Sequence, residues 1–326
     1  MKKYARLLGS AALLAVLAWR VDLALVARTL AGVCWWWWLG ALLCYVASQV
    51  LSSLRWQALA APLGFRRPLR DYVSLYFVGT FFNLLLPTSV GGDVARAWYL
   101  AGAGKRWPAF LSVLADRLSG LFVLLLMAFG AALVVPQEPW VRVAALGAGA
   151  AAALGLVLFL LAPLGNGGTE AGRGLRGKVR QVAAVLGLYR RSPRLVLVAT
   201  SLSALIQVAN VVLVWMLGQG AGLPLPLDYC FVLMPLVALL TLLPISVGGL
   251  GVREGAVVLL LAPRGIAAGQ AVTLSLLWFS VFVAAGLAGA GLYLSGRLPR
   301  YEVRTDDEPV GGHPDQGRTG QPRSAA

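Results

Sequence analysis

Long runs of residues without a charged side chain constrain this sequence more than any other feature. The runs are residues 29–54, 72–92, 118–137, 143–169, 195–217, 229–252 and 266–296. A helix rises about 1.5 Å per residue, so about 20 apolar residues cross a hydrocarbon core about 30 Å thick. Only 13% of the residues are charged, whereas soluble domains carry roughly 25%. The sequence therefore predicts an all-α, polytopic membrane protein rather than a soluble one.

Residues that usually bind metals or act as acids and bases are scarce in these runs. The single histidine, His313, lies in a polar tail, and the three cysteines, Cys34, Cys44 and Cys230, form no C-x-x-C pair. Free cysteines within apolar runs usually serve as packing residues. We therefore expect neither a metal site nor a cofactor.

The first residues fit either a signal peptide or a short first span. Residues 1–6 are basic and residues 7–19 are apolar, and Val16-Leu17-Ala18 could serve as a cleavage site. We favour a short first span, because a polytopic protein does not need a cleavable signal.

The distribution of basic residues predicts how the chain is oriented. With a cytoplasmic N-terminus, most of the 28 lysines and arginines fall into inner loops and tails, in agreement with the positive-inside rule. We expect a multi-pass protein of a bacterial-type cytoplasmic (inner) membrane, with both termini in the cytoplasm. The net charge of +15 is explained in this way, so no nucleic-acid partner is expected.

Two polar segments differ from the membrane region. Residues 170–194 are basic, with apolar residues near helical spacing, and are expected to lie as an amphipathic segment on the cytoplasmic surface; a solvated loop is the alternative. Residues 301–326 are rich in Pro, Gly, Asp and Arg and are expected to form a disordered cytoplasmic tail. Residues 1–300 are the predicted single transmembrane domain.

A twelve-residue motif occurs twice. Residues 85–96 (LLPTSVGGDVAR) and 242–253 (LLPISVGGLGVR) are identical at eight of twelve positions, at a constant offset of 157. Three crossings are predicted between the copies, near residues 107–134, 142–162 and 195–217. Because an odd number of crossings puts equivalent elements on opposite sides of a membrane, we interpret the copies as an inverted internal duplication.

Each copy of the motif interrupts an apolar helix. The segments are 71–86 and 94–103 around Pro87 and Gly91-Gly92, and 228–243 and 252–261 around Pro244 and Gly248-Gly249. Proline lacks a backbone donor and glycine tolerates unusual angles, so each break leaves backbone groups unpaired. Such backbone occurs at membrane depth only where it is packed in protein or lines a wet cavity. The predicted fold is a membrane helical bundle with an inverted repeat, about six full spans plus two re-entrant broken-helix hairpins, or eight helices if the hairpins count as spans.

The two breaks form a candidate site for an anionic headgroup. Each restarted helix would point its N-terminus, with its partial positive charge, into a central cavity. Arg96 and Arg253 lie about one turn into these helices, where a cation is unfavourable unless it meets an anion. Ser89 and Ser246 would add hydroxyl donors. Alternatively, the motif forms only a tight turn, with Asp93 as an ordinary cap.

Other charged residues lie near the ends of predicted spans. Arg55, Asp116 and Arg117 are close enough to the inner interface to snorkel, so anchoring at the membrane boundary competes with a functional role. We expect Asp93 to pair with Arg96 along one helix face. Asp116 and Arg117 are expected to face that pair from the next span.

The second copy carries two adjacent opposite charges. Arg253 and Glu254 are expected to point to different faces of the restarted helix, with at least one meeting the cavity. No residue is expected to be catalytic. The candidate substrate-binding residues are Asn83, Ser89, Gly91, Gly92, Asp93, Arg96, Asp116, Arg117, Ser246, Gly248, Gly249, Arg253 and Glu254.

Over about residues 4–297 the chain resembles the flippase-like transmembrane region of the lysylphosphatidylglycerol synthase family, in particular its stand-alone members. The matching residues are 82–87 (FNLLLP), 91–96 (GGDVAR), Asp116-Arg117, 243–249 (LPISVGG), Arg253-Glu254 and Leu54-Arg55-Trp56. The resemblance implies a region that moves or accommodates anionic or modified lipids across the bilayer. Other members accompany hopanoid or polyprenyl-phosphate sugar pathways.

The leading hypothesis is a lipid translocator for an anionic or polyprenyl-phosphate-type headgroup. In fused members of the family a separate cytosolic domain transfers the aminoacyl group, whereas this chain ends in a short polar tail, so we expect no enzyme activity. The alternative is a membrane-embedded enzyme or an accessory subunit of a lipid or glycolipid biosynthetic pathway. Expected partners are membrane lipids and, in the accessory role, pathway enzymes. The lipid, the direction and energy source of transport, and the oligomeric state stay open.

Overall fold

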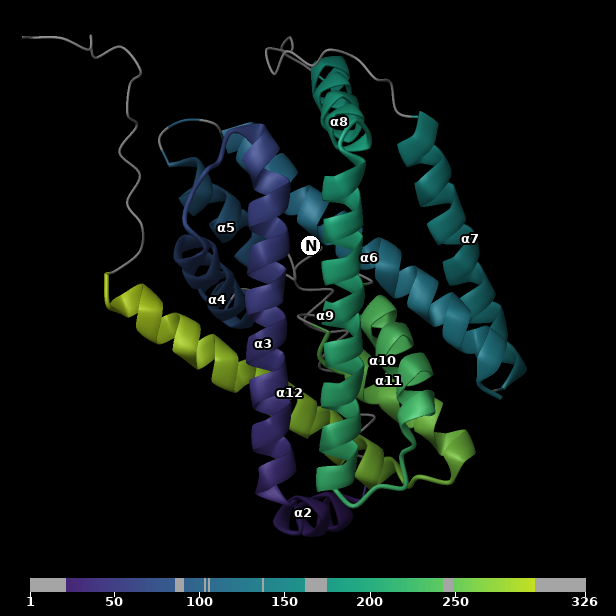
Figure 1. Ribbon diagram of the computed structural model, residues 1–326. Coiled ribbons are helices and arrows are strands. Elements are labelled where there is room, and N and C mark those ends of the chain that lie inside the picture. The colour runs from purple at the N-terminus through teal and green to yellow at the C-terminus, as the bar shows by residue number, and fades with distance from the viewer. Residues whose placement is uncertain are drawn as a thin grey trace, which may run out of the picture.

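The computed structural model describes residues 22–85, 91–102, 104, 106–136, 138–161, 175–242 and 249–296, and its regular elements in these ranges are all helices (Figure 1). The helices are α2 (Leu23–Ala31), α3 (Trp35–Ala60), α4 (Leu69–Leu85), α5 (Gly91–Ala101), α6 (Arg106–Val134), α7 (Pro139–Leu161), α8 (Leu175–Arg190), α9 (Pro193–Gly220), α10 (Leu227–Leu242), α11 (Val252–Leu261) and α12 (Ala268–Leu294), with 3-10 turns at Ala61–Leu63 and Ala262–Arg264.

Five helices in the described ranges are long and apolar enough to cross a membrane, namely α3, α6, α7, α9 and α12. The chain is therefore a multi-pass, all-helical membrane protein, as predicted. The expected first span near residues 7–19 and the tail at residues 301–326 lie outside the described residues. Helix α8 falls within the basic segment 170–194; that this segment lies on a membrane surface stays a prediction.

Helices α3 and α9 run side by side in opposite directions through the bundle (Figure 1). At the lower end in Figure 1, the backbone N–H of Cys34 donates to the carbonyl of Gly220 at 2.9 Å, which joins the start of α3 to the end of α9. At the upper end, the Tyr189 hydroxyl donates to the carbonyl of Leu59 at 2.7 Å and joins the end of α8 to the end of α3. These two contacts define the ends of the bundle.

The two pairs of short helices meet opposite ends of the α3–α9 pair. At the upper end, Gln57 donates to the carbonyl of Arg67 before α4 (2.8 Å), and Arg67 donates to the carbonyl of Leu100 near the end of α5 (3.2 Å). At the lower end, Gln219 near the end of α9 donates to the carbonyl of Leu225 before α10 (3.0 Å), and the Tyr229 hydroxyl on α10 donates to the carbonyl of Leu260 on α11 (2.5 Å). Equivalent elements of an inverted repeat lie at opposite sides of the membrane, so hairpins at opposite ends of the bundle fit such a repeat. The joining segments with Pro87 and Pro244 lie outside the described residues.

The helices of the first half of the bundle (α3–α6) recur in the second half (α9–α12) at the same offset of 157 residues that separates the two motifs. Shifting α3, α4 and α6 by 157 residues gives 192–217, 226–242 and 263–291, which overlap α9, α10 and α12. Shifting α5 gives 248–258, which overlaps α11. The similarity of the two copies is therefore not limited to twelve residues, since four consecutive helices have counterparts at the same offset.

Helices α3–α6 form the first half of the bundle and α9–α12 the second, and each half packs a short helix of the other. Helix α4 of the first half lies along α12 of the second, and α10 of the second half lies against α6 of the first. Glycines on α12 permit the first contact: a Cβ on Gly289 would lie 2.1 Å from the Phe77 carbonyl oxygen, and one on Gly286 would lie 2.1 Å from Leu84 Cδ1. Small residues at helix contacts are typical of membrane bundles. Each half therefore holds a short helix of the other.

The paired glycines of the motif act differently in the two copies. Gly91 and Gly92 form the first turn of α5, so the prediction that they belong to the break is wrong. The Gly92 N–H donates to the Asn83 side-chain oxygen at 2.8 Å, which satisfies a helix N-terminal donor. In the second copy, Gly249 (φ +80°) and Gly251 (φ +82°) adopt left-handed backbone angles in the turn before α11.

Candidate functional site

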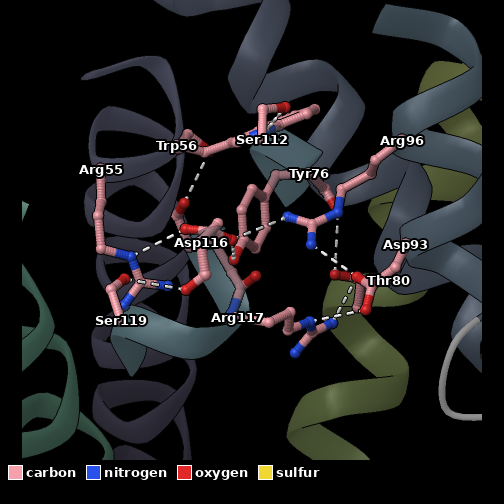
Figure 2. A network of polar contacts seen from close by, with 12 residues as sticks. Arg55, Trp56, Tyr76, Thr80, Asp93, Arg96, Ser112, Asp116, Arg117 and Ser119 are labelled. Carbon is pink, nitrogen blue, oxygen red and sulfur yellow. Dashed lines mark hydrogen bonds and ion pairs between the residues drawn. The ribbon is translucent and has the colours of Figure 1, made fainter. Parts of the chain in front are cut away.

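Asp93, in the first turn of α5, lies between two arginines (Figure 2). Arg117 of α6 donates through Nε to Asp93 Oδ2 and through Nη2 to Oδ1, at 2.7 Å each. Arg96, further along α5, donates through Nη2 to Asp93 Oδ1 at 2.6 Å. The expected Asp93–Arg96 pair is present, and Arg117 faces it from the next span, as predicted. Two guanidinium groups, which match carboxylate and phosphate geometry, thus converge on one anion.

Asp116 of α6 is fully buried and connects several helices (Figure 2). Arg55 of α3 donates through Nε to Asp116 Oδ1 at 2.8 Å, and the Tyr76 hydroxyl of α4 donates to Oδ2 at 3.0 Å. Arg96 Nη1 lies 3.5 Å from Oδ2. Arg55 also donates to Ser203 Oγ of α9 at 2.8 Å. A side chain that snorkels keeps its charged group in water at the membrane interface. Arg55 and Asp116 are instead buried and paired inside the protein, so they are not boundary anchors.

Arg96 is enclosed by aromatic rings. Its guanidinium carbon lies 4.1 Å from the centre of the Tyr76 ring and 5.0 Å from that of Trp56, both within the range of a cation–π interaction. Only 2% of the side chain is exposed, and Nη1 has no hydrogen-bond partner among the described residues. Buried donors nearly always have partners. Nη1 therefore marks a position where a further acceptor would be stabilised.

We call Arg55, Asp93, Arg96, Asp116 and Arg117 the charged cluster. Three arginines face two aspartates, so the cluster carries one positive charge in excess. An unbalanced charge is costly in a low-dielectric interior and favours the binding of an anion. Arg117 keeps 48% of its side chain accessible, whereas Arg55, Arg96 and Asp116 are buried. An approaching anion would therefore meet Arg117 first.

Glycines place Arg96 in the cluster. A Cβ on Gly92 would lie 2.0 Å from the Gly79 carbonyl oxygen, so α5 can approach α4 this closely only without that atom. A Cβ on Gly79 would lie 2.8 Å from Cγ of Arg96. The arginine side chain therefore crosses α4 over Gly79 on its way to Tyr76 and Asp116.

The second motif forms a smaller, neutral group at the start of α11. Arg253 donates to Glu254 through Nη2 and Nε, and Nε also lies 2.9 Å from Ser275 Oγ. Ser275 donates to Glu254 at 3.0 Å, and the Gly251 N–H donates to the other carboxylate oxygen at 2.6 Å. The prediction that Arg253 and Glu254 point to different faces is wrong, because the long arginine side chain folds back onto a carboxylate held by the first turn.

The other candidate residues separate into two groups. Asn83 accepts a hydrogen bond from Gly92, and Gly249 lies in the turn before α11, so both help to shape the hairpins. The rest of the candidates, Ser89, Ser246 and Gly248, lie outside the described residues.

Three uncharged members of the site were not predicted, namely Trp56, Tyr76 and Ser203. Aromatic and hydroxyl residues are frequent in apolar runs, so composition does not distinguish them. One signal was available for α4, where small and polar residues recur at the i, i+3, i+4, i+7 spacing of one helix face. These residues are Tyr76, Gly79, Thr80 and Asn83.

Comparison with known proteins identifies the family. No curated protein matches the chain. A family model described as the lysylphosphatidylglycerol synthase TM region matches residues 4–289, which include both motifs and the whole charged cluster. The match covers most of the 326 residues. The chain belongs to the family of lysylphosphatidylglycerol synthase transmembrane regions.

Proposed function

We propose that the protein is a lipid translocator that handles an anionic or polyprenyl-phosphate-type headgroup in the cytoplasmic membrane. The charged cluster carries this proposal, because it has an excess positive charge and a buried Arg96 donor without a hydrogen-bond partner among the described residues. A headgroup phosphate supplies both the missing charge and the acceptor. Membership of a family of membrane domains supports a lipid as the carrier of that phosphate.

Binding is favoured over acid–base catalysis by the state of the two carboxylates. Asp93 is held by Arg96 and Arg117, and Asp116 by Arg55 and a tyrosine hydroxyl. A general acid or base needs a carboxyl group that can reach its substrate and exchange a proton. Carboxylates occupied by arginines are poorly suited to this task, and well suited to position those arginines.

Alternating access is supported by the two hairpins at opposite ends of the bundle. The α4–α5 hairpin meets the upper end, which the positive-inside rule assigns to the cytoplasm, and the α10–α11 hairpin meets the lower end. In this mechanism the headgroup is bound at the cationic first copy. It leaves past the neutral Arg253–Glu254 pair when one half rocks against the other.

Transfer in reconstituted vesicles tests the proposal. Acyl-labelled phosphatidylglycerol and phosphatidylcholine are compared by quenching the outer leaflet, with unlabelled polyprenyl phosphate as a competitor. We expect faster transfer of the anionic probe, and a loss of at least tenfold in R117Q. The matched control is R142Q, which removes an exposed arginine from α7. Equal transfer of both probes by the wild type, or full activity in R117Q, would contradict the proposal.

A further inference from the structure

We propose that the phosphate of the lipid headgroup takes the position that the Asp93 carboxylate holds in this structure, so that Asp93 is a built-in anion that the lipid displaces. The inference rests on the proposed function and adds a role for one residue of the site. Asp93 competes with the substrate instead of binding it.

The hydrogen bonds of Asp93 are those of a bound anion. Its two oxygens accept three hydrogen bonds of 2.6–2.7 Å from the guanidinium groups of Arg96 and Arg117, and Arg117 contributes a parallel pair. An Arg fork binds one edge of a phosphate with the same two donors. The cluster therefore already has the donor geometry of a phosphate site, occupied by a side chain of α5.

A carboxylate does not use every donor that the cluster offers. Arg96 Nη1 is buried and lies 3.5 Å from Asp116 Oδ2, an ion-pair distance, but it makes no hydrogen bond among the described residues. A phosphate has more acceptor oxygens than a carboxylate, so it can keep the contacts now made to Asp93 and also reach Nη1. The exchange would improve hydrogen bonding at Arg96.

Asp93 is better placed for exchange than the other carboxylate of the cluster. Its side chain is 12% exposed and borders the accessible Arg117, whereas that of Asp116 is 0% exposed and is held by Arg55 and Tyr76. Once released, Asp93 remains in the first turn of α5, where the helix dipole favours a negative charge. Displacement therefore leaves the carboxylate in a tolerable environment.

Apolar surface next to the site favours a phosphate that is attached to acyl or prenyl chains. Val94 and Trp98 of α5 are 54% and 57% exposed, and Leu118, next to Arg117, is 47% exposed. Val94 and Trp98 lie one helical turn apart and so share a face of α5. A soluble phosphate compound would gain nothing from this surface, whereas a lipid would cover it.

Binding to two charge-matched variants tests the inference. Full-length wild type, D93N and D71N are purified in detergent and titrated with short-chain phosphatidylglycerol, phosphatidylcholine and glycerol phosphate. D93N and D71N each remove one negative charge, but Asp71 lies in the first turn of α4, outside the charged cluster. We expect D93N to bind phosphatidylglycerol at least fivefold more tightly than the wild type, and D71N to show no such gain.

The possible outcomes separate the two proposals. Unchanged or weaker binding in D93N, with the wild type still preferring phosphatidylglycerol, overturns displacement and leaves the proposed function standing. An equal gain in both variants shows an effect of net charge alone and also overturns it. Equal affinity for glycerol phosphate overturns the lipid assignment. A wild type without preference for the anionic lipid contradicts the proposed function itself.

A second measurement covers the case in which D93N does not fold. Val94 is exposed next to Asp93, so a thiol in V94C reports on the first turn of α5. We expect phosphatidylglycerol, but not phosphatidylcholine, to change the labelling rate of V94C at least threefold after subtraction of the wild-type rate. An unchanged rate at saturating phosphatidylglycerol would overturn displacement.

Discussion

The guanidinium of Arg55 and the carboxylate of Asp116 lie 2.8 Å apart in the interior of the bundle, with side chains only 6% and 0% exposed. The pair joins α3 to α6, and the hydrogen bond from Arg55 to Ser203 extends the connection to α9 of the second half. Two charges at this depth are tolerated only while they remain paired. Arg55 thus links the two halves through Ser203, and its pair with Asp116 is the fixed side of the charged cluster.

Replacing Asp116 by alanine is expected to destabilise the protein strongly. The substitution leaves Arg55 and Arg96 without their shared carboxylate, and breaking a buried ion pair costs about 3–5 kcal/mol. The free energy of unfolding in mixed micelles measures the effect. The control is E138A, which removes an exposed carboxylate between α6 and α7. A loss in D116A no larger than that in E138A would show that the pair contributes little.

Tyr76 is expected to contribute through both its hydroxyl and its ring. Y76F removes the hydrogen bond to Asp116 and should cost about 1.5–3 kcal/mol, the range for hydrogen bonds to charged groups. Y76L also removes the ring beside Arg96, and a desolvated cation–π interaction adds about 2 kcal/mol. Unfolding of both variants measures the two contributions. Equal stabilities of Y76F and Y76L would rule out a contribution from the ring.

Gly92 is expected to tolerate no side chain. In G92A the new Cβ would lie 2.0 Å from the Gly79 carbonyl oxygen, so α5 must move away from α4. Forced overpacking costs about 1–3 kcal/mol, and the shift should also reduce lipid transfer by displacing Arg96. The matched control is G255A on the counterpart helix α11, where a Cβ meets no atom within 4 Å. If both variants behave alike, the close contact of α4 and α5 is not required.

Gly289 tests the contact between the halves. A Cβ there would lie 2.1 Å from the Phe77 carbonyl oxygen, whereas one on Gly291, two residues further along α12, meets nothing within 4 Å. We expect G289A to lower the unfolding temperature and G291A to leave it unchanged or raise it, because alanine favours a helix by about 1 kcal/mol. Thermal unfolding of the detergent-solubilised protein measures both. An unchanged unfolding temperature in G289A would contradict tight packing of α4 on α12.

Much of this architecture could be predicted from the sequence, because two strong physical signals were present. The lengths of the uncharged, apolar runs predicted the long helices, and the repeated motif indicated where α4, α5, α10 and α11 lie. The pairing of Asp93 with Arg96 followed from their spacing along one helix. That Arg117 comes from the next helix was predicted as well, since a short loop makes α5 and α6 neighbours.

The rest depends on contacts between helices that no local pattern specifies. Arg55 could equally have been a boundary anchor, and only the packing of α3 against α6 and α9 buries it. The prediction for Arg253 considered only the backbone positions, and adjacent positions on a helix diverge. The arginine side chain is long enough to fold back and reach Glu254 all the same. Gly91 and Gly92 were assigned to a break because glycine tolerates unusual backbone angles. Both instead lie in α5, where Gly92 packs so closely on Gly79 of α4 that a side chain would not fit.

The exchanged packing of the two halves has a consequence for how the chain is made. Helix α4 ends at Leu85, but the helix along which it lies, α12, begins only at Ala268. During synthesis the first hairpin must therefore persist in the membrane without its final partner until the last helix of the bundle has been inserted. A chain that stopped after the first half could complete the same packing only with a second copy inserted the opposite way round.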